Sequence, residues 1–278
     1  MVGSASGSIA ADLDGKVNEM ALITDIHTHV LPGIDDGPND LEAAQNLLAA
    51  FHASGTDRVF CTSHLLSPHF DSNLDGLRAA YHRLTEGLTR HDGPELALGA
   101  ELRMTASLAD LLRMGEVPAL GDSHYVLCEF RSDHVSTRAL ELVHELVVRG
   151  YQPIMAHPER NLELQKHPER LDELAACGLL FQVTAQCFEA GPHDGHPGQR
   201  LAWRMLEEGR VAVIASDAHD PAVRPPGLLP AYEAISAHAG DAVAEVLIMN
   251  ANAIWADEPV RELVPARPKR SLWRRVFG

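Results

Sequence analysis

Histidines and carboxylates stand in this sequence at spacings that suit metal binding. His27 and His29 are separated by one residue, so in an extended segment their side chains point the same way and can grip one cation. Imidazole nitrogens and carboxylate oxygens without thiolates suit manganese, iron, zinc or magnesium. The residue types therefore point first to a divalent metal centre. The candidate ligands are His27, His29, Asp36, His64, Glu101, Glu129, His157, Asp217 and His219.

The composition supports this interpretation and excludes other classes of protein. Of the 278 residues, 16 are histidines, which is more than twice the ordinary usage of roughly 2%. A formal net charge of −16 argues against a nucleic-acid binder with a broad basic face, whereas carboxylates gathered around cations contribute to such an excess. Apolar residues at 45% and charged residues at 22% are typical of a globular protein.

The elements that must position these residues follow from hydrophobic periodicity. Short apolar runs alternate with amphipathic helical patterns, which is the βαβ pattern of a parallel sheet in an α/β fold. Seven such strands are enough to close a barrel, and no linker marks a second domain. The strand-sized runs cover residues 22–26, 58–61, 96–100, 125–130, 153–156, 179–184 and 211–215. The first predicted helix begins at Leu41 and is ended by Gly55. Further helices are predicted at 74–88, 136–149, 168–177, 197–208 and 241–253.

The two ends of the chain differ from the domain at 22–258. Residues 1–21 are rich in Gly, Ser and Ala without an apolar core segment, which predicts a flexible leader rather than a signal peptide. In the basic tail at 259–278, arginines alternate with Leu272, Trp273 and Phe277, so the tail is either a weak membrane or partner contact or a solvated end. Four cysteines without a Cys-x-x-Cys pair favour a reducing cytoplasm.

The candidate ligands follow the predicted strands. Six of the seven predicted strands carry or are followed by such a side chain, and in a parallel barrel the carboxyl ends of all strands open on one face. Residues that are scattered in the sequence are therefore expected to converge. Any one of them alone has an ordinary interpretation; Asp35-Asp36-Gly37, for example, reads as a turn. His69, His193 and His196 lie in loops and remain weaker candidates for proton donation or substrate contact.

Such a set of ligands is sufficient for two or three cations, and that suggests hydrolysis of a phosphate ester. Neighbouring cations can activate water near neutral pH and hold the phosphoryl oxygens. The site also needs fixed positive charge. Arg160 and Arg224 follow two of the ligand-bearing strands, and a guanidinium group offers a bidentate fork to phosphate. The alternative for each arginine is an ordinary surface ion pair.

Several motifs together resemble a known family. They are Asp25-Ile26-His27-Thr28-His29-Val30-Leu31-Pro32-Gly33-Ile34-Asp35-Asp36-Gly37, Gly99-Ala100-Glu101, Ala156-His157-Pro158-Glu159-Arg160 and Ser216-Asp217-Ala218-His219. The chain is similar to the polymerase and histidinol phosphatase (PHP) superfamily. Within it, the chain resembles the bacterial CpsB-type metal-dependent protein-tyrosine phosphatases of capsule and exopolysaccharide loci, from about Ile23 to about Asn252.

The resemblance implies a distorted (β/α)7 barrel with two or three divalent cations, usually manganese. By position, one ion would be held by His27, His29, Glu101 and Asp217. A second would be held by Glu101, Glu129 and His157, and a third by Asp36, His64 and His219. Arg160 and Arg224 would bind the phosphate, and together with His157 they form the expected catalytic group.

The resemblance further implies that the substrate is phosphotyrosine on a protein, a cognate tyrosine autokinase that controls polysaccharide synthesis. The sequence departs from the family at Ser63, before His64, where proline is common, and in the segment 184–198. A cysteine-based phosphatase is excluded because no cysteine has an arginine six positions later. Two alternatives stay open: a phosphoesterase acting on a small metabolite such as histidinol phosphate, and a non-catalytic, metal-stabilised scaffold that docks a kinase.

Overall fold

The computed structural model describes residues 22–86, 88, 93–189, 191–192 and 195–265. The predicted leader, His193 and residues 266–278 of the predicted tail lie outside this part of the chain. Residues 259–265, at the start of that tail, pack against the domain: Arg261 N donates to Asn250 Oδ1 at 2.7 Å, and Leu263 is buried. None of the helices within the described ranges is long and apolar enough to cross a bilayer.

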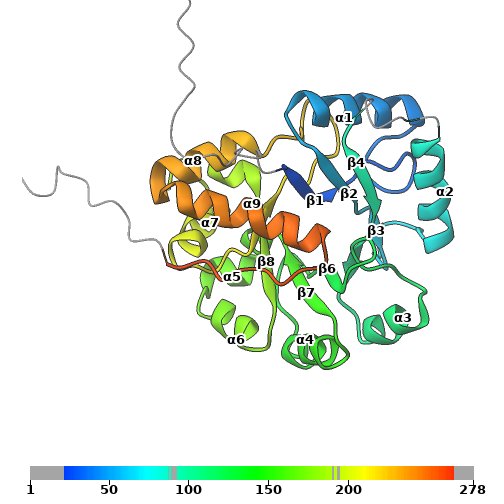
Figure 1. Cartoon of the computed structure of the whole chain (residues 1–278). Helices are drawn as coiled ribbons and strands as arrows, with labels where there is room; N and C mark the ends of the chain where they lie inside the picture. The colour runs from blue at the N-terminus through cyan, green and yellow to red at the C-terminus, as the bar shows by residue number, and fades with distance from the viewer. Residues whose placement is uncertain (1–21, 87, 89–92, 190, 193–194, 266–278) are drawn as a thin grey trace, which may run out of the picture.

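Parallel strands in sequence order form the centre of the molecule (Figure 1). They are β1 (Thr24–Thr28), β2 (Arg58–Cys61), β3 (His64–Leu65), β4 (Glu95–Leu98), β5 (Glu101–Arg103), β6 (Tyr125–Glu129), β7 (Gln152–Ala156), β8 (Leu180–Thr184) and β9 (Val213–Ala215). Two sheets result, ordered β1-β2-β4 and β3-β5-β6-β7-β8-β9, and every pairing is parallel. The predicted single-domain α/β fold with parallel strands is confirmed.

Two short strands lie beyond the predicted ones. The predicted strand at 58–61 is β2, and β3 begins after a gap of two residues; likewise β4 ends at Leu98, and β5 begins after a gap of two residues. At the second gap, a Cβ atom on Gly99 would lie 2.9 Å from Leu120 Cδ2, so a larger residue would require the Leu120 side chain to shift. The strand predicted at 96–100 is observed as β4, and the last two predicted residues lie between β4 and β5. The gap makes Glu101 the first residue of β5, where it pairs with His64 of β3.

Few hydrogen bonds join β1 of one sheet to β9 of the other. Between β9 and β1 the structure has an isolated bridge joining Thr28 and Ala218. Around it, Asp217 N donates to His27 O at 2.9 Å, and His29 N donates to Ala218 O at 2.8 Å. These contacts between the two sheets therefore involve the backbone of three candidate ligands, His27, His29 and Asp217.

The helices have the amphipathic faces that the sequence predicts. In α1, the Asp40 side chain caps the N-terminus by accepting from Ala43 N at 2.9 Å, and Leu47, Leu48 and Phe51 are buried. The short helices α3 and α5, and α8, were not predicted. The helices are α1 (Leu41–Ala53), α2 (Leu74–Thr85), α3 (Leu108–Met114), α4 (Ala139–Val148), α5 (Leu162–Lys166), α6 (Arg170–Ala176), α7 (Pro197–Glu207), α8 (Leu229–Ala239) and α9 (Asp241–Trp255), with 3-10 turns η1 (Pro158–Arg160) and η2 (Ala185–Phe188).

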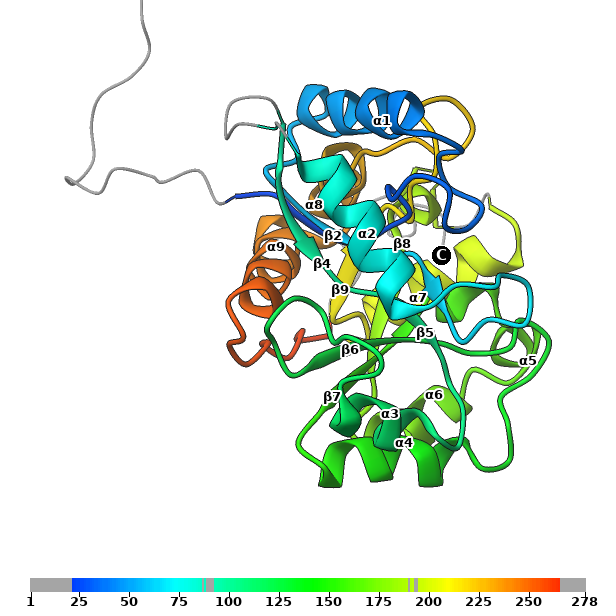
Figure 2. The same cartoon turned by 90° about the vertical axis from the view of Figure 1, so that its right-hand side faces the viewer.

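Helices surround the strands, and the core lies between the two. In both views α1 and α4 lie at opposite ends of the molecule, with the strands between them (Figures 1 and 2). A large apolar cluster packs strands against helices, and a smaller one joins Ile26, Phe60, Leu127 and Ile154 to Ile254 of α9. This packed scaffold carries the carboxyl ends of the strands, where the candidate ligands lie.

Candidate metal centre

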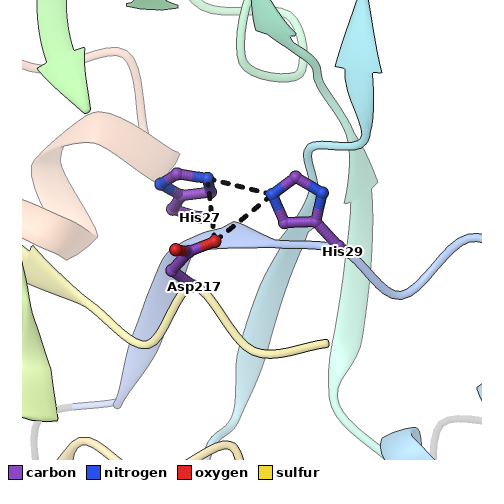
Figure 3. A group of neighbouring side chains, drawn as sticks. All are labelled: His27, His29 and Asp217. Carbon is purple, nitrogen blue, oxygen red and sulfur yellow. Dashed lines mark hydrogen bonds and ion pairs between the residues drawn. The ribbon is translucent and has the colours of Figure 1, made fainter. Parts of the chain in front are cut away.

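Four side chains from distant parts of the sequence meet at the carboxyl ends of the strands, and we call them the buried donor set: His27, His29, Glu101 and Asp217. The Nε2 atoms of His27 and His29 are 3.2 Å apart. Glu101 Oε2 lies 3.3 and 3.4 Å from these nitrogens, and Asp217 Oδ1 lies 3.4 and 3.3 Å from them. Each residue is at most 2% exposed. Figure 3 shows both imidazoles turned toward the Asp217 carboxylate.

The other nitrogen of each imidazole has its own partner. His27 Nδ1 lies 2.9 Å from Gln182 Oε1, and His29 Nδ1 lies 2.7 Å from Asp35 Oδ2. Because each Nδ1–H donates to an oxygen, the neutral form of each ring has its lone pair on Nε2. Two nitrogen lone pairs and two carboxylate oxygens then face one point, which is the arrangement of metal ligands with oriented second partners.

The electrostatics of the buried donor set favour a cation at that point. Burial lowers the pKa of His29, but Asp35 and Asp217 outweigh it and hold that pKa well above its usual value. Burial also opposes ionisation of Glu101, yet His27 and His157 hold its pKa well below the usual range. The carboxylates thus stay ionised and draw positive charge into a site that is closed to solvent. A divalent cation supplies that charge directly.

Several buried atoms near this point lack hydrogen-bond partners. Within the described residues, Glu101 Oε2, His64 Nδ1 and His219 Nε2 form no hydrogen bond. His64 Nδ1 is only 3.0 Å from Glu101 Oε2, and His219 Nε2 only 3.1 Å from Asp36 Oδ1, without the alignment of a hydrogen bond. Buried polar atoms without partners are costly, and metal coordination would satisfy them. The residues present therefore fit divalent cations.

The other predicted ligands surround this set, four of them nearer the solvent and His219 buried, and we call them the rim donors: Asp36, His64, Glu129, His157 and His219. His157 Nε2 lies 2.9 Å from Glu101 Oε1. His64 Nε2 lies 3.7 Å from Asp36 Oδ1. The structure thus brings His157 to Glu101, and it brings Asp36 to both His64 and His219. Three further groups of donor atoms lie within 4.8 Å of one another: His27 with Glu101 and His157, His29 with Asp36 and His219, and His29 with His64 and Glu101.

Glu129 belongs to none of these groups of described residues. Its Oε2 pairs instead with Arg103 Nη1 at 3.1 Å. The cause is the strand register, because Arg103 of β5 stands directly opposite Glu129 of β6. Arg103 also donates to Phe130 O at 3.2 Å. The sequence analysis missed this arginine, although it lies two residues after Glu101 in an extended segment and so points to the same side.

Two site residues have strained backbone. His157 has a φ of 35° and Asp217 a φ of 53°, in the left-handed region that disfavours residues with a Cβ atom. Strain of this kind costs about 1–3 kcal/mol per residue and tends to occur where function fixes a side chain. His157 directly follows the buried strand β7, and Asp217 lies two residues after the buried strand β9, so the fold tolerates strain where these side chains turn into the site.

Both predicted arginines reach the buried donor set from its open side. Arg160 Nη1 lies 2.6 Å, and Arg224 Nη2 2.5 Å, from Asp217 Oδ2, the oxygen that does not face the histidines. Arg160 Nη2 also donates to Thr184 Oγ1 at 3.1 Å. The two guanidinium groups line a pocket of about 250 Å³ together with Glu101, His157 and other donors. This pocket, the site pocket, combines metal ligands with fixed positive charge.

Three residues that support the ligands were not among the predicted site residues. Asp35 Oδ2 accepts from His64 N at 2.9 Å as well as from His29, so one carboxylate orients two ligands. Asp25 is a fully buried residue of β1, and its Oδ1 accepts from Ser216 N at 3.1 Å. Burial raises the pKa of Asp25 to about 6. The carboxylates were visible in the motif. Gln182 had no sequence signal, because it lies in a strand-like run.

The weaker candidates lie farther out. His69 is exposed and lines neither the site pocket nor the pocket beside it. His196 is the N-cap of α7, where its side chain accepts from Gln199 N, and it lines that neighbouring pocket. Neither imidazole approaches the buried donor set.

Comparison with known proteins identifies similar chains. The family model "Capsular polysaccharide synthesis, CpsB/CapC" matches residues 23–256. The tyrosine-protein phosphatase YwqE of Bacillus subtilis is 30% identical over 91% of this chain and 98% of its own. The tyrosine-protein phosphatase CpsB of Streptococcus pneumoniae is 30% identical over 81% of this chain and 95% of its own. This chain also superposes on a crystal structure from a study of YwqE and CpsB, which are described there as unique metal-dependent tyrosine phosphatases. The TM-score is 0.81 and the identity 27%, and the match covers 90% of this chain and 100% of that chain.

Proposed function

This chain belongs to the CpsB/CapC family of capsular polysaccharide synthesis, and from that premise we propose that it is a metal-dependent phosphatase that hydrolyses phosphotyrosine on proteins. The observation that carries the proposal is the buried donor set. Two oriented imidazoles and two carboxylates face one point, and the far oxygen of Asp217 meets two arginines. Ligands for a cation and a cradle for an anion thus share one residue, as hydrolysis of a phosphate monoester requires.

The cations are proposed to occupy the groups that the family resemblance implies. The buried donor set would hold one ion, and Asp36, whose carboxylate lies 3.7 Å from His64 and 3.1 Å from His219, would hold another with these two histidines. His157 with Glu101 would hold a third, which Glu129 joins only if its carboxylate turns from Arg103. When bound, such cations lower the pKa of water toward neutrality and neutralise charge on phosphoryl oxygens. Manganese is the proposed metal, and iron, zinc and magnesium are the other ions that suit these ligands.

The arginines are proposed to bind the phosphoryl group. Their guanidinium groups meet at Asp217 Oδ2, so two sets of N–H donors already point to one oxygen position. Thr184 holds the Arg160 side chain from the other side, which limits the entropy lost when phosphate binds. A tyrosine leaving group has a pKa near 10, so it departs with less proton donation than an alkoxide needs. This accounts for a site rich in cation ligands and arginines.

The finer assignments rest on the family resemblance. We propose that the phosphotyrosine lies on a bacterial tyrosine kinase of the same polysaccharide locus and that the reaction takes place in the cytoplasm. The basic tail at 259–278 would contribute weak contact with a membrane surface through its arginines. Each of these statements concerns the partner or the compartment, and none changes the chemistry of the site.

One experiment with several readouts tests the function. Purified protein is analysed for bound metals by elemental analysis, and its activity is measured on a phosphotyrosine peptide and on histidinol phosphate, before and after treatment with a chelator. We expect at least two equivalents of divalent metal, preference for the peptide, and loss of activity on chelation that manganese restores. Preference for histidinol phosphate would instead assign a small-metabolite phosphoesterase.

Two variants separate catalysis from scaffolding. We expect His157→Ala and Arg160→Ala to reduce turnover by at least about a hundredfold, because each removes a charged or ligating contact in the site pocket. Their circular dichroism and thermal unfolding should remain close to those of the unchanged protein, since both side chains are partly exposed. If both variants kept full turnover, the chain would be a metal-stabilised scaffold and the proposed enzyme would be abandoned.

A further inference from the structure

A second pocket, of about 380 Å³, begins at the same pair of arginines. Arg160, Asp217 and Arg224 line both this pocket and the site pocket. The remaining walls of the second pocket come from η1, α5, the end of β8, η2, the start of α7 and the loop after β9. Because the pockets meet at the arginines, a substrate whose phosphoryl group binds there can extend into both.

Glu159 lies in the wall of the second pocket and is completely buried. Its Oε1 accepts from Thr184 N at 3.2 Å and lies 3.8 Å from Cys187 Sγ. Its Oε2 has no hydrogen-bond partner among the described residues, and the nearest guanidinium contact, Arg160 Nε, is 4.0 Å from Oε1. A buried carboxylate oxygen without a donor is costly, so this atom is suited to receive a donor from a ligand.

Two glutamines of the same pocket also present oxygens. Gln165 Nε2 donates to Glu159 O at 2.8 Å, and Gln186 Nε2 donates to Pro225 O at 3.1 Å. Each amide therefore keeps Oε1 as an acceptor and a second N–H on Nε2 as a donor. The ionised Glu159 carboxylate, by contrast, can only accept, and its Oε2 is without a partner among the described residues. A ligand that satisfies this oxygen must donate a hydrogen bond.

We propose that the second pocket is a subsite for the polypeptide next to the phosphotyrosine, which it binds through backbone or side-chain amide N–H groups. The proposal rests on the proposed function and names its substrate class more closely. A neutral donor fits better than a cation, because Arg160 and Arg224 line the same pocket and would repel a second positive charge. Backbone amides are neutral donors that every polypeptide carries.

The subsite would distinguish proteins from small aryl phosphates. A small aryl phosphate can occupy the arginines and the site pocket, but it has no chain to reach Glu159. A phosphotyrosine peptide would gain hydrogen bonds in the second pocket and bind more tightly. The expected signature of the subsite is therefore an advantage in KM for the peptide over a small aryl phosphate, with similar kcat for both.

Two variants test the subsite by different means. Glu159→Gln keeps the shape of the side chain and the bond from Thr184 N, but replaces the free oxygen with an N–H donor. Val223→Trp narrows the rim of the pocket from a side chain that is 83% exposed. The matched control is Val148→Trp on α4, at a side chain that is 69% exposed and lines neither pocket. Each metal-loaded protein is assayed with a phosphotyrosine peptide and with p-nitrophenyl phosphate.

The measured quantity is the ratio of kcat/KM for the peptide to kcat/KM for p-nitrophenyl phosphate. We expect this ratio to fall about tenfold in Glu159→Gln and Val223→Trp through a higher KM for the peptide, since one or two hydrogen bonds are lost. The ratio should stay the same in Val148→Trp. Calorimetric binding of a non-hydrolysable phosphonate peptide should weaken by the same factor.

An unchanged ratio in both pocket variants would overturn the subsite while leaving the phosphatase intact. An equal fall in the control variant would overturn it as well, because the effect would not come from the pocket. If Glu159→Gln failed to fold, Val223→Trp alone would decide. If the unchanged protein hydrolysed neither substrate, the proposed function would fall, and the subsite with it.

Discussion

The buried donor set and the rim donors use the same residue types in different surroundings. In the buried donor set, each imidazole is oriented by an oxygen of Gln182 or Asp35, and no residue is more than 2% exposed. Among the rim donors, the Asp36 side chain is 46% exposed and the Glu129 side chain 19% exposed. Both rim carboxylates also have an arginine nearby, at 3.5 Å for Asp36 and 3.1 Å for Glu129.

This difference in burial and orientation explains how one site can bind two cations with unequal affinity. The buried ligands lose little freedom when a cation binds, because their orientations are already fixed. At the rim, Asp36 must first be ordered, because its side chain is 46% exposed, and a cation must compete with Arg103 for Glu129. We therefore expect one tightly bound ion in the buried donor set and weaker binding at the rim.

Paired carboxylate variants test this contrast most strongly. Glu101→Gln should lower kcat/KM by about a thousandfold or more, since Glu101 contacts donors of both regions through its two oxygens. Glu129→Gln, which removes the same charge at the rim, should lower it only about tenfold. Elemental analysis should find the tight ion lost in Glu101→Gln and retained in Glu129→Gln. Equal losses in the two variants would break the contrast between the regions.

Much of the fold and of the site could be predicted from the sequence because both depend on local patterns. The face of α1 follows from the spacing of Leu47, Leu48 and Phe51, and parallel strands then bring their carboxyl ends together. That inference placed His27, His29 and Asp217 in one place although they are far apart in the chain. The meeting of Arg160 and Arg224 was expected on the same grounds.

The features that sequence analysis missed depend on contacts between distant residues. The gap between β4 and β5, before Glu101, lies where Gly99 passes close to Leu120, and no local pattern reveals that contact. The pairing of Arg103 with Glu129 depends on the register of β5 and β6. Gln182 lies within a strand-like run, and its role appears only when β8 is placed beside β1. Side chains that support ligands were therefore harder to predict than the ligands.

A second pair of variants compares the residues that support the ligands. Asp35→Asn weakens the acceptor that orients His29, so we expect the affinity for the first metal to fall about 10- to 100-fold. Asp36→Asn should lower the affinity for Mn²⁺ less than Asp35→Asn does, since the Asp36 carboxylate lies at the rim and already contacts Arg224. Isothermal titration of the chelator-treated proteins with Mn²⁺ measures both. A larger effect in Asp36→Asn would reverse the proposed order of the two regions.

The smallest expected effect concerns stability and pH in the metal-free protein. Burial raises the pKa of Asp25, behind the buried donor set, to about 6, so the folded state binds more protons than the unfolded state between about pH 4 and about pH 6. Ionised Asp25 therefore lowers the free energy of unfolding by about 1 kcal/mol as the pH rises from about 5 to about 7.

At the rim the sign is opposite. Burial acts to raise the pKa of Asp36, but His219 outweighs it and lowers that pKa, so the contribution of Asp36 to the free energy of unfolding is lost as the pH falls. The free energy of unfolding is measured with urea, in the presence of chelator, as a function of pH. Asp25→Asn should remove the decrease in this free energy above about pH 5, whereas Asp36→Asn should remove part of its decrease at acidic pH. If Asp25→Asn left the pH dependence unchanged, burial would not be what distinguishes the two regions.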